Sequence, residues 1–370
     1  MGPVEGTSRV ASSVRKKRPA RVLFAALLFI VLYFLLFPYP LGRELVARPR
    51  WAVPVPPSGS PLAADPARPS WQFQLGNKFG YVQGDGSVQY SGTALYRVAL
   101  SSTAFVNYTR LGTDWILQDR SGRRLASFSG NGYPLLGPEG SRIFNVKTDL
   151  SGIIELDRTG GALWERDFPA LMTSVSLQGD SLLVGLLNGS LLLINSLGSP
   201  LFEYSPGGSR IPVVLGTAVA PDRSLIAAVC GIGPQYLTVL RRRNDGYAPF
   251  ASLELPSDYR REVRMGFSPD SRYLFLEGPS GAGLFDPAGK AFRWVSLRGK
   301  LVGAAFPVSG RLAAIASSDG GRAQLAIEPP AGVAVSREEF SARELFLGTI
   351  DGQLLLGWDG QLARIDIEAM

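Results

Sequence analysis

Short apolar runs separated by turn-forming residues occupy most of the chain after residue 70. The stretch 181–205, SLLVGLLNGSLLLINSLGSPLFEYS, has apolar runs on both sides of Asn188-Gly189 and a third after Leu197-Gly198. An Asn-Gly pair between apolar runs is a favoured two-residue hairpin turn. Runs bounded by Gly, Asn, Asp, Ser and Pro are typical of strands, and we find no convincing amphipathic helix pattern between them. The pattern therefore predicts an all-β domain over residues 71–370.

One pattern recurs in this region: Asp or Asn, two residues, Gly, two residues, and then Leu or Phe. It occurs as DRSGRRLA at 119–126, DRTGGALW at 157–164, NSLGSPLF at 195–202 and DPAGKAFR at 286–293. Including weaker copies, the glycines recur at a mean interval of about 39 residues. A period near 40 with about four strands per period is typical of the blades of a β-propeller.

The number of blades depends on how the two ends of the repeat region meet. The last glycine interval is short, so we expect the first hairpin, 79–91, and the last strands, 344–367, to share one blade. This arrangement predicts a single propeller of seven blades, and eight blades is the alternative.

The repeated turns contain residues that a cofactor site could also use. In neighbouring copies Trp164 is replaced by Ala126 or Phe202, which disfavours a cofactor site. We interpret the acidic residue as an acceptor for turn amides, the glycine as a residue of positive φ, and the aromatic residue as packing between blades. The residues given this structural role are Asp119, Gly122, Asp157, Gly160, Trp164, Asn195, Gly198, Asp286 and Gly289.

The N-terminal part has a different pattern. Six basic residues precede the apolar run VLFAALLFIVLYFLLF at 22–37, and a proline-rich stretch follows it. This order predicts a basic cytoplasmic tail over 1–21, a transmembrane helix in the lipid bilayer over 22–41, and a Pro-rich linker over 42–70. The expected location is a bacterial inner membrane, with a single-pass anchor, the N-terminus cytoplasmic and the propeller periplasmic. A cleaved signal peptide is the alternative.

Charge and composition exclude several classes of function. Ten of the 38 Lys and Arg and three of the 31 Asp and Glu precede residue 71, so 28 of each follow it. This balance argues against a nucleic-acid partner. The chain has no histidine and only one cysteine, Cys230, which excludes Ser-His-Asp and Cys-His catalysis and a disulfide within the chain.

The tandem turns resemble those of the WD40-like and PQQ-like bacterial β-propellers. FSPDSRYL at 267–274 is close to the blade turn of the former, and LDRTGGALW at 156–164 to the blade end of the latter. The resemblance covers nearly all of 71–370 and implies the fold, which hosts enzymes, receptors and scaffolds alike. It leaves a quinoprotein-like dehydrogenase as one alternative. No Cys-Cys pair and no calcium-loop spacing accompany the repeats, so we expect no cofactor and no metal.

The least repetitive stretch is LPSDYRREVRMGF at 255–267. Loops between blades form recognition surfaces, and Tyr and Arg are enriched at binding hot spots. The candidate partner-binding residues are Asp258, Tyr259, Arg260, Arg261 and Arg264; the alternative is a solvated loop. We therefore favour a binding, scaffold or sensor module for a protein or envelope polymer over an enzyme. A hydrolase that acts on a glycan through two carboxylates is the contrasting class.

Overall fold

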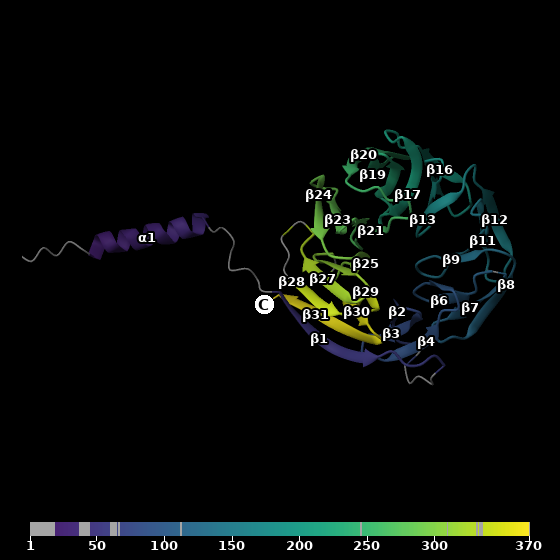
Figure 1. Cartoon of the computed structure of the whole chain (residues 1–370), viewed down its shortest axis with the longest axis horizontal. Helices are drawn as coiled ribbons and strands as arrows, with labels where there is room; N and C mark the ends of the chain where they lie inside the picture. Colours follow the sequence, from purple (N-terminus) through teal and green to yellow (C-terminus); the bar gives the residue numbers. More distant parts are fainter. Residues whose placement is uncertain are drawn as a thin grey trace, which may run out of the picture. The chain divides into compact units, whose positions relative to one another are not determined.

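The computed structural model describes residues 19–36, 45–59, 65, 67–111, 113–244, 246–308, 310–330, 332 and 336–369. The chain divides into two compact units: residues 1–46 with 369–370, and residues 47–368. The second unit is a ring of β-sheets (Figure 1), so the all-β prediction is confirmed.

The first unit contains one helix, α1 (Pro19–Leu36). Its 18 residues extend about 27 Å, compared with about 30 Å for the apolar core of a bilayer. Within the described residues, no helix has the length and apolar character needed to cross a membrane. This finding contradicts the transmembrane helix predicted over 22–41: α1 ends at Leu36, and residues 37–41 lie outside the described part of the chain.

Eight sheets make the ring, and each is one blade. Blade 1 has three strands and the others have four. Blades 1 to 4 contain β2 (Ser70–Leu75), β3 (Lys78–Gln83), β4 (Val88–Thr93); β5 (Arg97–Leu100), β6 (Ala104–Tyr108), β7 (Asp114–Asp119), β8 (Arg124–Ser129); β9 (Tyr133–Leu136), β10 (Ile143–Val146), β11 (Gly152–Leu156), β12 (Ala162–Asp167); and β13 (Met172–Gln178), β14 (Ser181–Leu186), β15 (Leu191–Ile194), β16 (Pro200–Tyr204).

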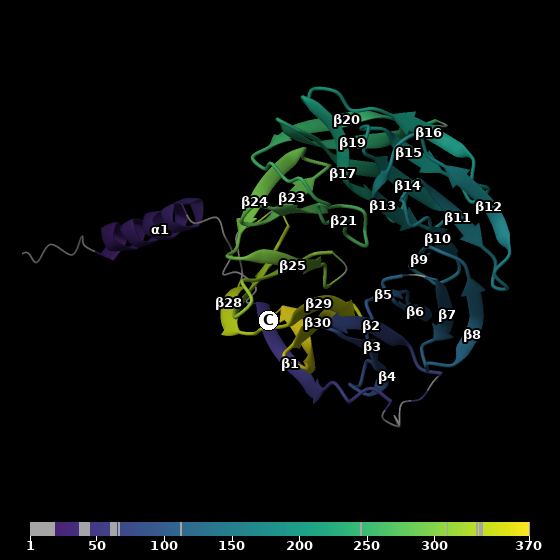
Figure 2. The same ribbon diagram turned by 45° about the vertical axis from the view of Figure 1, so that its right-hand side comes forward.

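Blades 5 to 8 complete the ring. They contain β17 (Ile211–Val219), β18 (Leu225–Ile232), β19 (Gln235–Arg243), β20 (Gly246–Leu255); β21 (Met265–Phe267), β22 (Leu274–Gly278), β23 (Gly281–Asp286), β24 (Ala291–Ser296); β25 (Lys300–Ala305), β26 (Ala313–Ser318), β27 (Arg322–Glu328), β28 (Ser336–Ser341); and β29 (Leu345–Ile350), β30 (Gln353–Trp358), β31 (Gln361–Ala369) with β1 (Leu45–Pro54). Figure 2 shows inner strands such as β13, β21 and β25 toward the middle of the ring, and β8, β12 and β24 at its rim.

The apolar core lies between successive blades. In β14, Leu182 joins a buried cluster with Phe144 and Ile153 of blade 3, whereas the next residue, Leu183, joins a cluster with Val214 of blade 5. Successive side chains of a strand point to opposite faces of the sheet. Because both faces of a blade are covered, all six residues of β14 are buried, and the strand reads as one continuous apolar run.

The prediction of seven blades is wrong, and the alternative of eight is the one found. The first hairpin and the last strands form separate sheets, β2–β3–β4 and β29–β30–β31. The fourth strand of the last blade is β1, which lies beside β31 (Figure 1). Residues 45–54, which the sequence pattern placed in the linker over 42–70, therefore close the ring in place of the first hairpin.

Candidate functional site

A pocket of 410 Å³ collects side chains from three successive blades and from one distant loop. We call it the tyrosine pocket. It is lined by Tyr96, Arg97 and Tyr108 of blade 2; Tyr133, Val146 and Leu150 of blade 3; Met172, Thr173, Ser174 and Val175 of blade 4; and Glu262 of the loop between blades 5 and 6.

Three tyrosines form one wall of this pocket. Tyr108, at the end of β6, packs between Tyr96 and Tyr133, with ring-centroid distances of 6.4 Å and 6.3 Å. The backbone amide of Tyr96 donates to the carbonyl of Tyr108 at 3.2 Å, which fixes the turn before β5. Burial raises the pKa of Tyr108, so its phenol is neutral at pH 7. The wall thus presents aromatic surface and phenolic donors together.

Charged groups of both signs accompany the tyrosines. The guanidinium of Arg97 lies 5.4 Å from the ring centroid of Tyr96. Glu262 keeps contact with solvent, but burial of its carboxyl by surrounding atoms raises its pKa, and the positive charges of Arg264 and Arg97 oppose that effect. The pocket can therefore bond to a donor and an acceptor of one ligand.

The loop that carries Glu262 is tied down on both sides of it. Arg261 makes two hydrogen bonds to the buried carboxylate of Glu277, at 3.0 Å and 2.8 Å. Arg264 donates to the carbonyl of Val302 in blade 7 at 2.6 Å. A bidentate arginine–carboxylate pair fixes geometry as well as contributing energy. These contacts hold Glu262 toward blades 2, 3 and 4.

The five predicted partner-binding residues do not line the tyrosine pocket, and four of them contact one another within the loop. The guanidinium of Arg261 lies over the Tyr259 ring at 4.7 Å, and Arg260 forms an exposed ion pair with Asp258 at 3.6 Å. None of the five, Arg264 included, is among the residues that line the tyrosine pocket. Their role in binding a partner stays a prediction. In the structure, their contacts hold the loop in its conformation.

Sequence reasoning missed the residues of the pocket itself. Tyr96, Tyr108, Tyr133 and Met172 lie in three different blades, and no local spacing connects them. The one local signal was the loop around Glu262, whose lack of repetition marked it as unusual.

The repeated turns show how their polar residues are used. Oδ1 of Asp157 accepts from the amides of Thr159 and Gly161 at 2.7 Å and 2.9 Å, and Oδ1 of Asn195 accepts in the same way from Leu197 and Ser199, both at 2.9 Å. Asp119 makes the equivalent bonds to Ser121 and Arg123, and Asp286 bonds to Ala288. The side chains of Asp157 and Asn195 thus accept equivalent hydrogen bonds from the amides of their turns.

Three of the turn glycines have positive φ: Gly122 at 83°, Gly160 at 93° and Gly198 at 75°. In the fourth turn this conformation falls on Lys290, with φ of 50°, and Gly289 does not have it. Glycine adopts positive φ without the strain that a Cβ imposes.

An aromatic side chain of the outermost strand packs on the turn of the next blade. The indole of Trp164 covers Gly198, and its Nε1 donates to the carbonyl of Ser196 at 3.1 Å. This aromatic clasp repeats at five junctions: Trp51 on Gly86, Tyr90 on Gly122, Phe128 on Gly160, Trp164 on Gly198, and Phe202 on Gly246. The turns and aromatics therefore join blades, and they lie apart from the tyrosine pocket.

These features define a β-propeller with a pocket lined by three of its blades and one loop. A family model described as "beta-propeller protein" matches residues 14–370, and the chain belongs to that family. The propeller architecture expected from the resemblance is confirmed.

Two comparisons extend this result. The chain is 24% identical over 362 residues to a protein of Treponema pallidum (strain Nichols) described as an uncharacterized protein, covering 96% of this chain and 95% of that one. It is also similar to the crystal structure of BamB from Moraxella catarrhalis, with a TM-score of 0.60 and 15% identity over 87% of this chain and 100% of that chain. At this identity the second similarity shows the fold alone.

Proposed function

We propose that this propeller is a binding module and that the tyrosine pocket recognises a segment of a protein partner. The observation that carries the proposal is the convergence of aromatic rings with Arg97 and Glu262 from four separate parts of the chain. Aromatic and arginine side chains dominate the energetic centres of protein interfaces. A pocket of this composition suits an apolar side chain whose backbone bonds to the two charged groups.

An apolar rim supports a protein as the partner. Leu95, Leu150, Leu171 and Leu187 are 68%, 37%, 44% and 50% exposed. Backbone hydrogen bonds join Met172 to Leu150 and Leu187 to Leu171, so three of these leucines lie on adjacent segments beside the pocket. Contiguous exposed apolar residues next to a pocket mark interaction surfaces.

A glycan hydrolase is less well supported by the same pocket. That chemistry needs two carboxylates facing one sugar ring. Glu262 is the one carboxylate that lines the tyrosine pocket within the described residues. The arrangement favours recognition over cleavage.

The location of the propeller stays a prediction. We propose that it works outside the cytoplasm, because the basic segment and apolar run at the N-terminus fit a cleaved signal peptide.

Site-specific photocrosslinking of the full chain in its own cells tests the binding proposal. We would place the crosslinker at Leu150 or Leu171, and at Leu197, 78% exposed in a repeated turn, as the control. One protein should crosslink at the first two positions only, and a Tyr96→Ala, Arg97→Gln double variant should reduce its yield by about tenfold. The same bands at Leu197, or an unchanged yield in the double variant, would show that the pocket is not the recognition site.

A further inference from the structure

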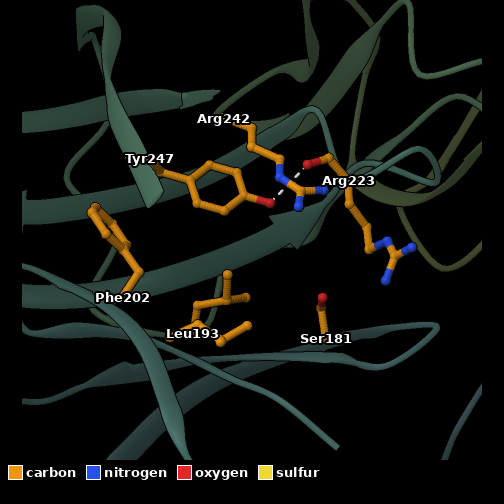
Figure 3. Close-up of a pocket in the computed structure, with 7 residues that line it drawn as sticks. Ser181, Leu193, Phe202, Arg223, Arg242 and Tyr247 are labelled. Atoms are coloured by element: carbon orange, nitrogen blue, oxygen red, sulfur yellow. Dashed lines mark hydrogen bonds between the residues drawn. The ribbon is translucent and has the colours of Figure 1, made fainter. Parts of the chain in front are cut away.

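A second pocket, of 270 Å³, lies between blades 4 and 5 and shares no residue with the tyrosine pocket. Blade 4 contributes Ser181, Leu193 and Phe202, and blade 5 contributes Arg223, Arg242 and Tyr247 (Figure 3). Figure 3 shows Phe202, Leu193 and the Tyr247 ring on one side, and the Ser181 hydroxyl with the two arginines on the other. The pocket therefore has an apolar wall and a polar wall.

The apolar wall is held in place by the blades. The hydroxyl of Tyr247 donates to the backbone carbonyl of Arg223 at 2.7 Å, and the Tyr247 ring lies 5.8 Å from that of Phe202. Leu193 is buried in the cluster that joins the two blades. This wall needs no rearrangement to receive an apolar or aromatic group.

The polar wall offers donors that lack acceptors. Ser181 is 6% exposed, and its hydroxyl makes no hydrogen bond to any described residue but is not sealed from solvent. Both arginines of this wall are exposed: Arg242 has no ion pair or side-chain hydrogen bond within the described residues, and Arg223 meets only Asp180, at 3.8 Å.

We propose that this pocket binds a small amphipathic anion, namely a carboxylate or phosphate group attached to an apolar body. Guanidinium groups and a hydroxyl are the donors that such oxyanions prefer, and hydrogen bonds to a charged group are the stronger ones. The volume lies just below the range of about 300–1,000 Å³ typical of drug-sized ligands, so the group that enters is small. An anion here would supply acceptors to Ser181 and Arg242 while its apolar part packs on Phe202.

This proposal stands independently of the function proposed for the tyrosine pocket. The two sites have different residues, and crosslinking at Leu150 does not report on the space between blades 4 and 5.

Titration calorimetry of the full chain with three probes tests the anion site: N-acetyl-L-phenylalanine, its neutral amide, and phenyl phosphate. At least one of the two anions should bind, and it should bind about tenfold more tightly than the amide. The neutral amide cannot make the hydrogen bonds between an anion and the guanidinium groups. The tighter anion identifies the natural ligand as a carboxylate or a phosphate. Equal binding of acid and amide, or no binding of any probe, would overturn the proposal.

Three variants locate the site. Arg242→Gln should weaken anion binding by about tenfold, whereas Arg243→Gln, the adjacent arginine outside the pocket, should change it by less than about twofold. Ser181→Ala changes the side-chain volume little and should weaken anion binding severalfold. This variant keeps the test valid if Arg242→Gln does not fold. If the anion binds equally to all three folded variants, its site is elsewhere and the proposal is wrong.

Discussion

Two junctions between blades have the same contact between a tryptophan and a turn glycine, but the strands that carry the two tryptophans are connected differently to the rest of the chain. Trp51 donates from Nε1 to the carbonyl of Gly84 at 2.8 Å and covers Gly86. Trp164 donates to Ser196 at 3.1 Å and covers Gly198. The first clasp lies on β1, the strand that closes the ring in blade 8, and contacts blade 1; the second lies on β12 of blade 3 and contacts blade 4.

The difference lies in what else holds each strand. β12 follows β11 through a short turn and continues into β13, so the chain keeps it in place on both sides. β1 is far in sequence from its partner β31, and only non-covalent contacts hold it there. Closure therefore depends on backbone hydrogen bonds and side-chain packing between β1 and β31, whereas the inner blades also have short covalent turns between their paired strands.

The largest expected effect comes from the matched substitutions Trp51→Ala and Trp164→Ala. Both rings are half-buried, so each loss should lower the free energy of unfolding by about 3 kcal/mol. In Trp51→Ala, β1 should in addition open locally, because nothing covalent keeps it on β31. Denaturant unfolding measures the first effect, and amide hydrogen exchange the second.

Exchange should accelerate in β1 and β31 of Trp51→Ala, and it should remain slow in β11 and β12 of Trp164→Ala. Equal acceleration at the two junctions would contradict the idea that the closing seam is the weaker one.

A smaller effect is expected from adding a methyl group beneath the aromatic ring. A Cβ at Gly198 would lie 2.6 Å from the Trp164 ring, one at Gly86 3.1 Å from Trp51, and one at Gly160 3.4 Å from Phe128. All three glycines have positive φ, so each alanine variant carries a backbone penalty of about 1 kcal/mol. Gly198→Ala should add about 1 kcal/mol of steric strain.

Thermal unfolding should therefore rank the variants Gly198→Ala, Gly86→Ala, Gly160→Ala, from the least to the most stable. Gly160→Ala acts as the control for the φ penalty alone. A Gly160→Ala variant as unstable as Gly198→Ala would mean that the contact with the ring adds nothing.

The repeat predicted the β-propeller fold and its turns, but the number of blades and the closing strand could not be predicted from it. Each of these turns carries its own polar acceptor, and three of the four place a glycine at the position of positive φ, so a local pattern can predict them. β1 contains Pro49 and Pro54, which made it resemble a linker. Proline is tolerated in an outermost strand because one of its edges needs no hydrogen-bond partner.

The tyrosine pocket could not be predicted from the sequence for a related reason. Tyr108 and Tyr133 come from different blades, and Glu262 lies more than a hundred residues further along the chain. The two tyrosines meet because their blades are neighbours, and Glu262 joins them because the loop between blades 5 and 6 also lines this pocket. The 255–267 loop was singled out by its lack of repetition, but its arginines bond to Glu277 and Val302, and the pocket receives Glu262.

The smallest expected effect concerns the charge in the repeated turn, where Asp157 and Asn195 do the same work. Hydrogen bonds from the Thr159 hydroxyl and the Gly161 amide hold the pKa of Asp157 below its ordinary value of 3.8. A lowered pKa means that the charge stabilises the fold above pH 3.8, and that this contribution is lost as the pH falls through the lower folded-state pKa.

Asp157→Ala, which removes the acceptor, should lower the melting temperature at pH 7 by a few degrees, whereas Asp157→Asn should lower it less because the amide oxygen still accepts. The gap between the wild type and Asp157→Asn should close in melts at pH values below the folded-state pKa of Asp157, where the carboxyl is protonated. Asn195→Asp is the reverse control and should introduce the same pH dependence at the neighbouring junction. If the gap persisted in acid, the turn would depend on the shape of the side chain and not on its charge.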